Sequence, residues 1–346
     1  MMPKDGNHPQ EPSWPRRLYR WAYWFPRDLR LFLRYGRPQK VVYFGGTGFG
    51  DDLLLATVLH ELRKRGERRL AVVSRLEELF QKAPFVDAVI KEDWRILEAA
   101  KRFGGRPIKP TYYVQSVDPH YDIPSRNHII TAMCHSAGIR GRVDLRTYLT
   151  LTSEERVKGQ LRPDQAVIQA TAGTSTNFSA NKVWHRDRYQ AVVDHFRGRL
   201  NFVQLGSSGD PLLKGVMDQR GRTTLRESAA ILSQSSLCVT YVGFLMHLAR
   251  AVDVRSVVIF GGRERPDQSG YTCNENLFYP VACAPCWLRS RCHFARECMD
   301  GITALDAIAA AERILARGEA PLETAHEDVP DTLAASIPPW VGRHEL

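Results

Sequence analysis

Residues 40–52 carry the sequence KVVYFGGTGFGDD, and this stretch decides the fold class. Its apolar run, Val41 to Phe44, is typical of a buried strand, and the glycines that follow are typical of a tight turn. Beyond the turn, apolar residues recur at helical spacing over residues 53–65, which predicts a helix. A strand, a glycine turn and a helix in succession form the first unit of a parallel α/β sheet.

The alternation of strands and helices continues along the chain in two halves. The first half is expected to hold strands at 70–73 and 86–90, helices at 76–82 and 128–137, and an extended stretch at 146–151. The second half is expected to hold strands at 166–170, 201–205, 237–241 and 256–260, and helices at 186–197, 225–233, 245–252 and 304–317. A length of 346 residues suits two domains, so the sequence predicts an α/β protein with two parallel sheets.

The expected organisation follows from this alternation and from composition. Its parts are a basic aromatic arm at 1–40, an N-terminal domain at 41–155, a linker at 152–163, a C-terminal domain at 166–325 and a tail at 326–346. Ligands of open parallel sheets bind beyond the carboxyl ends of the strands, so we expect the substrate in the cleft between the domains. The loop at 108–125, rich in proline and aromatic residues, is expected to border that pocket.

The formal charge of +10 is concentrated in the arm, where residues 1–40 hold nine Lys or Arg against three acids. Eight aromatic residues between Trp14 and Tyr35 are interleaved with these arginines. This combination suits an anionic membrane interface. Alternatively, the aromatic residues pack on the protein's own core or on a second copy while the arginines face water. No recognition motif for nucleic acid accompanies the charge, so nucleic acid is not an expected partner.

No apolar run approaches the roughly 20 residues that a membrane-spanning helix needs. The N-terminus is polar and rich in proline where a signal peptide would be apolar. We therefore expect a cytoplasmic protein, with peripheral contact to the inner membrane as an option through the arm.

Four of the seven cysteines form the pattern Cys283-x2-Cys286-x5-Cys292-x5-Cys298, directly after an apolar strand and the Gly261-Gly262 turn. Thiolates this close on one loop favour a structural metal site at residues 283–298. Disulfides and free buried thiols are the alternatives, although an odd number of cysteines argues against complete pairing. The other cysteines, in apolar surroundings, are expected to behave as small buried hydrophobic residues.

Two turns carry candidate chemistry. At the first, no P-loop lysine follows the glycines, and Asp51 would repel a phosphate, so this carboxylate is either a helix cap or a general base aimed into the cleft. In the second half, Lys182 follows a hydroxyl-rich loop that starts at Thr171. The loop and the lysine either form a phosphate-binding site, or Lys182 is an ordinary surface lysine. The helix start at Gly243 would point free N–H groups at a diphosphate, with His247 as a further ligand or a core residue.

Together these segments resemble glycosyltransferase family 9, the ADP-heptose transferase family, over roughly residues 41–317. The most specific segments are Thr224-Leu225-Arg226-Glu227, Met246-His247-Leu248-Ala249 and the strand and turn at 257–262. The Cys-Ala-Pro-Cys-Trp sequence at 283–287 is similar to that of family members with a cysteine cluster, some of which bind iron through it. The resemblance implies a GT-B fold: two Rossmann-like domains with the active site in the interdomain cleft.

What the resemblance implies for function is inverting transfer of a sugar, heptose being favoured, from a nucleotide-diphosphate sugar such as ADP-heptose. The acceptor would be a hydroxyl of a lipid-linked saccharide, a protein or a metabolite, and no catalytic metal is implied. Asp51 matches the proposed catalytic base of the family. The implied donor-binding residues are Thr171, Lys182, Asp210, Gly243, Met246 and His247. The implied ligands of a structural zinc or iron ion are Cys283, Cys286, Cys292 and Cys298.

One position departs from the family pattern. Family members usually carry an Asp-Ser/Thr-Gly triplet before the conserved histidine, whereas this chain has Val242-Gly243-Phe244. The missing carboxylate is thought to contact the donor, so its loss favours a changed donor site or lost activity. The rival function is therefore a non-catalytic GT-B protein that binds a nucleotide sugar or serves as a scaffold, with a structural metal.

Overall fold

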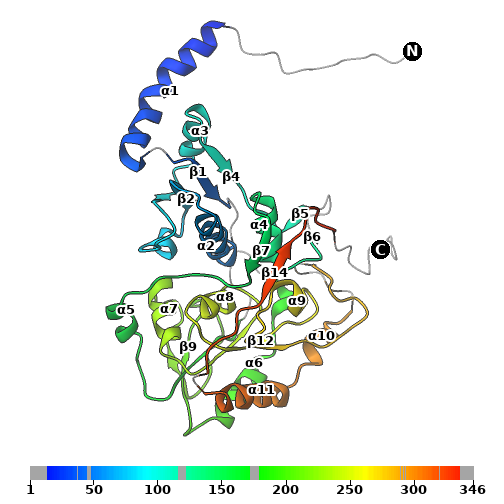
Figure 1. The fold of residues 1–346 in the computed structure, drawn as a ribbon. Coiled ribbons are helices and arrows are strands. Elements are labelled where there is room, and N and C mark those ends of the chain that lie inside the picture. Colours follow the sequence, from blue (N-terminus) through cyan, green and yellow to red (C-terminus); the bar gives the residue numbers. More distant parts are fainter. Residues whose placement is uncertain are drawn as a thin grey trace, which may run out of the picture.

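The structure is a computed structural model, shown in Figure 1. It describes residues 14–36, 38–44, 48–115, 122–171, 179–288, 290, 292, 294–318 and 320–335. Some predicted features lie outside these described residues. They are the turn residues 45–47, the hydroxyl-rich loop residues 172–176, and the outer parts of the arm and tail at 1–13 and 336–346.

The N-terminal domain is built on a parallel sheet of strand order β3-β2-β1-β4. Its strands are β1 (Lys40–Tyr43), β2 (Leu70–Ser74), β3 (Ala88–Lys91) and β4 (Arg106–Ile108). Successive strand residues point to opposite faces of a sheet. Val42 accordingly packs in the cluster that contains α2 (Phe49–Lys64), whereas Val41 packs in the cluster that contains α3 (Arg95–Arg102). Both faces of this sheet are thus covered by helices.

The C-terminal domain is built on a second parallel sheet of order β10-β9-β8-β11-β12-β13. Its strands are β8 (Gln165–Ile168), β9 (Asn201–Gln204), β10 (Met217–Asp218), β11 (Cys238–Tyr241), β12 (Ser256–Ile259) and β13 (Glu275–Leu277). Its helices are η2 (Ala180–Lys182), α6 (Arg186–His195), α7 (Leu225–Ser233), α8 (Phe244–Ala251), α9 (Pro266–Ser269), α10 (Glu297–Asp300) and α11 (Ala304–Ala316). The α/β prediction with two parallel sheets is confirmed.

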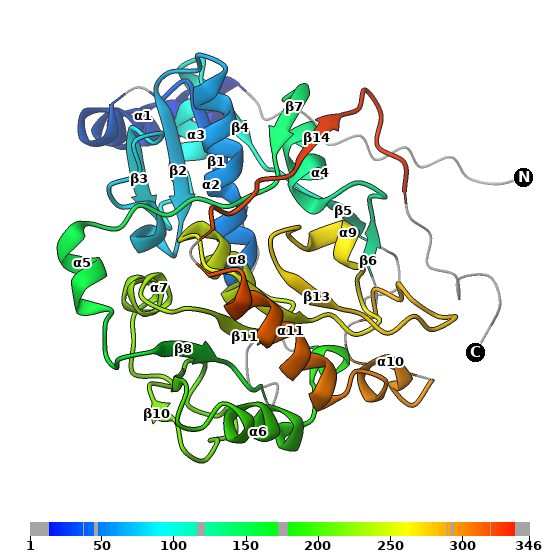
Figure 2. The same ribbon diagram turned by 60° about the horizontal axis from the view of Figure 1, so that its bottom comes forward.

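The two domains meet where α2 packs against α8, as Figure 2 shows near its centre. Leu54 and Leu55 of α2 belong to the same buried cluster as Leu245 and Leu248 of α8. At the start of α2, Gly50 makes this approach close, because a side-chain Cβ there would lie 3.2 Å from His247 Cδ2. The carboxyl ends of β1 and β11, which lead into α2 and α8, therefore face one another where the domains meet.

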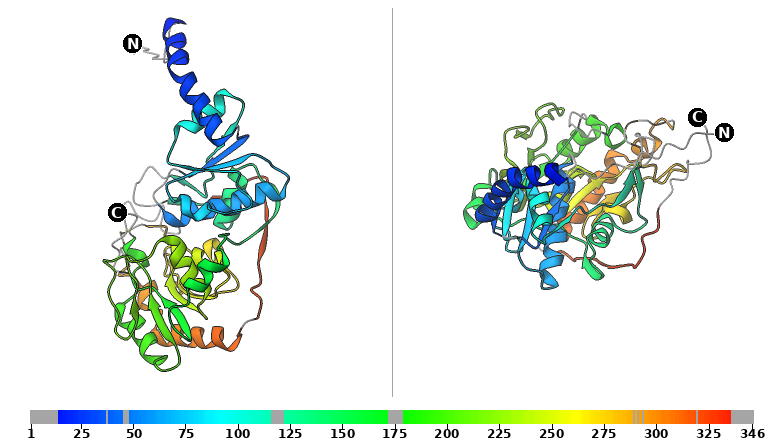
Figure 3. Two further views of the ribbon diagram at one scale, coloured as in Figure 1. Left: turned by 90° about the vertical axis from the view of Figure 1, so that its left-hand side faces the viewer. Right: turned by 90° about the horizontal axis from the view of Figure 1, so that it is seen from above.

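The arm is a helix, α1 (Trp14–Tyr35), that projects from the N-terminal domain in Figure 3. This helix was not predicted from the sequence. The last three turns of α1 dock on α3 through Asp28, which is fully buried and pairs with Arg95 (3.2 Å) and Arg102 (2.8 Å). Phe32 packs edge-on against Phe103, with ring centroids 4.5 Å apart. For this docked face, the interpretation that the aromatic residues pack on the protein's own core is confirmed.

The segment predicted as a tail returns to the N-terminal domain. There β14 (His326–Val329) pairs antiparallel with β7 (Gly141–Asp144), side by side in Figure 2. The linker contains a short helix, α5 (Ser153–Lys158), because Thr152 and Glu155 form a capping box. The remaining elements are η1 (Glu77–Phe80), β5 (Tyr113–Gln115), β6 (Asp122–Pro124) and α4 (Ile129–Ser136). None of the helices in the described ranges is both long and apolar enough to cross a bilayer.

Candidate active site

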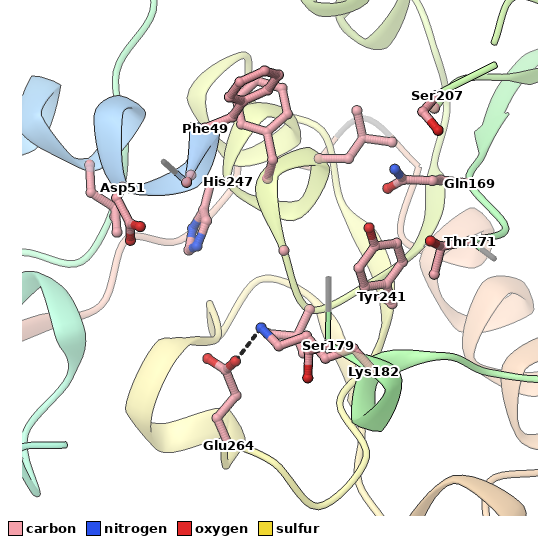
Figure 4. Close-up of a pocket in the computed structure, with 18 of the residues that line it drawn as sticks. Phe49, Asp51, Gln169, Thr171, Ser179, Lys182, Ser207, Tyr241, His247 and Glu264 are labelled. Carbon is pink, nitrogen blue, oxygen red and sulfur yellow. Dashed lines mark ion pairs between the residues drawn. The ribbon is translucent and has the colours of Figure 1, made fainter. Parts of the chain in front are cut away.

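A cavity of about 660 Å³ lies between the two domains, and Figure 4 shows the residues around it. The N-terminal domain contributes the start of α2 and the loop before β5, and the C-terminal domain contributes the loops that follow β8, β9, β11 and β12. The predicted interdomain cleft is present. Of the predicted border at residues 108–125, Tyr112 and Tyr113 line the cavity, and residues 116–121 lie outside the described part of the chain. The predicted site residues that line it are Asp51, Thr171, Lys182, Asp210, Gly243 and His247. Met246 instead lies fully buried in the core, outside the lining.

Asp51 lies inside the first turn of α2. The N-cap residue of α2 is Gly48, and no side chain caps this end of the helix. Asp51 is therefore not a helix cap. The Tyr112 hydroxyl donates a hydrogen bond of 2.9 Å to Asp51 Oδ1. Burial raises the pKa of Asp51 to about 6, although this hydrogen bond and the charge of Lys182 both act to lower it. A carboxylate with a pKa near neutrality is suited to accept a proton from a substrate hydroxyl.

Asp52, the next residue, points away from the cavity. The Ser74 hydroxyl donates to Asp52 Oδ1 over 2.9 Å, and the side chain is buried. Burial raises the pKa of Asp52 also, with Ser74 and Arg75 acting against it. Of these two adjacent acids, Asp51 lines the cavity between the domains and Asp52 does not.

His247 lines the cavity and is also firmly held. Its Nδ1 lies 2.6 Å from the Tyr271 hydroxyl, and the Thr147 hydroxyl donates to its backbone carbonyl over 2.6 Å. Burial lowers the pKa of His247 to about 3, so the imidazole is neutral at physiological pH. The sequence predicts either a ligand contact or a core position for His247, and the residue has features of both, since it is buried and lines the cavity.

Charged groups of both signs converge on the opposite wall. Glu264 Oε1 accepts from Lys182 Nζ at 2.5 Å and from Arg263 Nη1 at 3.0 Å, while Oε2 accepts from the Ser269 hydroxyl at 2.6 Å. Burial alone would raise the pKa of Glu264, but the two cations hold it at about 2. Burial lowers the pKa of Lys182, and Glu264 opposes that effect. Lys182 and Arg263 are therefore kept close together at the cavity wall, with Glu264 between them.

Sequence reasoning missed Tyr112, Arg263 and Glu264. Arg263 and Glu264 directly follow the Gly261-Gly262 turn at the carboxyl end of β12, a position where parallel sheets place ligand-binding side chains. Their position after the end of this strand was the sequence feature that could have identified them as site residues. Tyr112 gave only the weaker signal of an aromatic residue in a proline-rich loop.

Asp210 closes the loop that follows β9. Its Oδ2 accepts from the Ser207 backbone N–H at 2.8 Å. Gly206 has a φ of +135°, and a Cβ there would lie 2.5 Å from the same carboxylate oxygen, so a side chain at this position is excluded. Asp210 therefore holds a loop at one end of the cavity, and the Thr171 hydroxyl near it bonds the Tyr241 hydroxyl.

Val242 occupies the position where the resembling family usually has an acid. Its backbone N–H donates to the Ile259 carbonyl at 3.0 Å, which extends the β11–β12 pairing by one residue. Its side chain is buried and reaches the cavity only as an apolar surface. Beyond the end of the neighbouring strand β12, Glu264 brings a carboxylate to the cavity.

No disulfide bond joins any of the seven cysteines, all of which lie within the described residues. Burial is the largest cause that raises the pKa of Cys283 and of Cys298, and the proximity of neighbouring cysteines raises both further. Burial raises the pKa of Cys286 to about 12. Within the described part of the chain, no group of three or more His, Cys, Asp or Glu side chains has the arrangement of a metal site. The four thiols of the loop are thus neighbours, and their donor chemistry suits zinc or iron, but they do not form a closed ligand set.

Comparisons with known proteins agree with this architecture. Residues 145–287 match the family model of glycosyltransferase family 9 (heptosyltransferase). No curated protein sequence matches the chain. Among solved structures, the iron-containing dodecameric glycosyltransferase TibC from enterotoxigenic E. coli is 17% identical, with a TM-score of 0.63 and coverage of 81% of this chain and 76% of TibC. A complex of TibC with ADP-D-beta-D-heptose superimposes with a TM-score of 0.64 at 15% identity and similar coverage, 81% and 77%.

Two further structures share the fold. A family 9 glycosyltransferase from Veillonella parvula is 15% identical, with a TM-score of 0.58 and coverage of 81% of this chain and 98% of that one. The ADP-heptose lipopolysaccharide heptosyltransferase II of E. coli is 14% identical, with a TM-score of 0.55 and coverage of 80% and 99%. At these identities the likeness establishes the GT-B fold, as the sequence predicted. The sequence likeness is confined to one part of the chain: residues 145–287 match the model of glycosyltransferase family 9 (heptosyltransferase).

Proposed function

We propose that this protein is an inverting glycosyltransferase that moves a heptose-like sugar from a nucleotide-diphosphate sugar to a hydroxyl group of its acceptor. One observation carries the proposal. Asp51, a carboxylate with a pKa of about 6, faces a cavity of about 660 Å³ whose far wall holds the Lys182 ammonium. A base on one domain and a cation on the other is the arrangement that sugar transfer across an interdomain cleft requires.

The reaction would proceed in one displacement. The acceptor oxygen attacks the anomeric carbon from the Asp51 side, and Asp51 takes up the hydroxyl proton as the new C–O bond forms. The bond between the anomeric carbon and the diphosphate oxygen breaks on the opposite side, and the diphosphate leaves with the electron pair. Lys182 and the backbone N–H groups at the start of α8 would stabilise the negative charge that develops there. Attack and departure on opposite sides give inversion.

The donor is proposed to be ADP-heptose or a close analogue. Support comes from the family 9 match and from the complex of the similarly folded TibC with ADP-D-beta-D-heptose. Thr171, Asp210 and Gly243 lie around the end of the cavity where the nucleotide would bind. Because Val242 supplies no carboxylate, we propose that Glu264 takes the polar contacts to the donor that an acid would otherwise make from that position.

A second candidate function rests on Val242 itself: a non-catalytic protein that binds a nucleotide sugar or serves as a scaffold. Isothermal titration with ADP-, GDP-, UDP- and dTDP-sugars, followed by donor-turnover assays, separates the two. The enzyme should bind ADP-heptose and release ADP slowly even without acceptor, and Asp51→Ala should abolish release while preserving binding. Binding without any turnover in the wild type would support a non-catalytic nucleotide-sugar-binding protein. No binding of any donor would refute the enzyme and favour the scaffold.

We further propose that Cys283, Cys286, Cys292 and Cys298 hold a structural zinc or iron ion. Supporting this are the spacing of the cysteines, the proximity of their thiols, and the iron content of TibC, which has the same fold. A metal here would fix the loop after β12 and supply no chemistry to the transfer step.

Elemental analysis of the purified protein tests this site. The expected result is about one metal ion per chain, lost in a Cys283→Ser/Cys298→Ser variant and retained in Cys273→Ser, a control that alters a buried cysteine outside the loop. Wild-type protein without stoichiometric metal would refute it.

A further inference from the structure

The docking of α1 on α3 fixes which face of α1 is turned outward. Asp28 is fully buried between two arginines, and the Arg95 guanidinium lies 3.2 Å from the centre of the Trp24 ring. Phe25 and Phe32 both contact the Phe103 ring, with centroids 5.8 Å and 4.5 Å away. A charged pair, a stacked guanidinium and two ring contacts on one side leave the helix little freedom to rotate about its axis.

The outward face of α1 has two parallel rows of exposed side chains. Leu29 and Leu33 form an apolar row one helical turn apart, and they are 42% and 79% exposed. Beside it runs a basic row of three exposed arginines, listed here in order: Arg27, Arg30 and Arg34. The single acid in residues 14–36 is Asp28, and it lies on the docked side. The outward face is therefore apolar along one edge, positive along the other, and free of negative charge.

We propose that this face of α1 binds the surface of an anionic phospholipid membrane. Leucine side chains can enter the boundary between headgroups and acyl chains, while arginines beside them pair with lipid phosphates. Figure 3 shows the helix projecting beyond the N-terminal domain, so a flat surface can reach it. The proposal does not depend on the proposed enzyme activity, since it rests on a surface remote from the cavity.

A second copy of the chain fits this face less well. In a two-fold symmetric contact the same surface meets itself, so the arginine rows of two copies would approach one another. Like charges brought together at an interface disfavour association. A lipid surface, in contrast, supplies negative charge opposite all three arginines at once.

Vesicle co-sedimentation of the full chain tests the proposal. The probes are vesicles of phosphatidylcholine alone and vesicles that contain 30% phosphatidylglycerol, at roughly physiological salt, where charge interactions reach about 8 Å. Binding is expected to the anionic vesicles and to weaken as salt is raised. Each arginine near an anionic surface contributes roughly fivefold in affinity, so Arg27→Gln/Arg30→Gln/Arg34→Gln should lose about 100-fold.

Two further variants separate a specific surface from general charge. Leu29→Ser/Leu33→Ser should lose about tenfold or more through the apolar row alone. The matched control Arg197→Gln/Arg222→Gln/Arg265→Gln removes the same charge from exposed arginines of the C-terminal domain and should bind as the wild type does. Unchanged circular dichroism spectra verify folding.

Three results would overturn the proposal. One is a wild type that sediments with neither vesicle, and another is a control that loses as much affinity as the α1 variant. The third is a wild-type dimer, seen by light scattering, that the Leu29→Ser/Leu33→Ser variant converts to a monomer, because the face would then be an interface between copies.

Discussion

Replacing Asp51 with Asn is expected to abolish sugar transfer and, at the same time, to stabilise the folded protein at neutral pH. The reason is the cost of keeping this carboxylate ionised in its site. Burial raises its pKa from 3.8 to about 6, so the folded protein holds a charge there less readily than the unfolded chain does. Asn has nearly the same shape, carries no charge, and can still accept the hydrogen bond from Tyr112.

The size of the effect follows from the shift. Two pKa units correspond to about 3 kcal/mol, which is the upper limit of the gain in unfolding free energy for the variant at pH 7. Since the folded-state pKa is the higher one, the folded state binds the proton more tightly between about pH 4 and pH 6. The wild type therefore recovers stability as pH falls through that window. At pH 4 the advantage of the variant should shrink to less than about 1 kcal/mol.

Urea unfolding at pH 7 and pH 4 measures both values, with circular dichroism as the readout. Asp194→Asn is a matched control on an exposed helix surface: the Arg197 guanidinium lowers the pKa of Asp194, so loss of this charge should be neutral or slightly destabilising. Two results would contradict this reasoning: an Asp51→Asn variant less stable than the wild type at pH 7, or a difference in unfolding free energy that is the same at pH 7 and pH 4. Either would show that burial does not raise the cost of ionising Asp51.

Three other substitutions test the surrounding contacts. Tyr112→Phe removes a hydrogen bond that lowers the pKa of Asp51, so the acid limb of the kcat/KM profile, expected near pH 6 in the wild type, should move to higher pH; an unmoved limb would contradict the contact. Glu264→Gln removes the group that opposes the burial-driven fall in the Lys182 pKa, so nucleotide affinity measured by titration calorimetry should begin to decline at a lower alkaline pH than in the wild type. Gly50→Ala places a Cβ 3.2 Å from the His247 imidazole, which the Tyr271 hydroxyl holds in place. The overpacking cost of about 1–3 kcal/mol should exceed the roughly 1 kcal/mol that Ala gains over Gly in a helix, so urea unfolding should show a less stable variant, whereas an unchanged or higher midpoint would mean that His247 yields without strain.

Local sequence pattern predicted the elements whose side chains repeat regularly. Helix α7 begins and ends at the predicted residues because Thr224 and Glu227 form a capping box at its start and apolar residues recur along it. The predicted extended stretch at 146–151 is present, but it forms no strand in the described structure. Its side chains are used singly: the Thr147 hydroxyl bonds α8, and the Tyr148 ring stacks on His60 at 3.9 Å.

The contacts that define the candidate site were beyond local pattern. Tyr112 lies 61 residues from Asp51, and Lys182 lies 82 residues from its partner Glu264. No periodicity connects residues so far apart, since the fold alone brings them together. Helix α1 was missed for a related reason, because its buried acid is explained only by the arginines of α3.

The pairing of β14 with β7 has a mechanical consequence. The chain crosses between the domains once after β7 and once more before β14. Within β14, Glu327 accepts hydrogen bonds from Asn127, His128 and Thr131, which anchors this returning segment to the N-terminal domain. Two chain crossings between the domains restrict twisting and sliding of one domain against the other. Rotation of the domains about the line that joins the two crossings is then the easiest relative movement. Opening of the cavity to admit a donor should therefore resemble a door on two hinges, with an axis defined by the two crossing points.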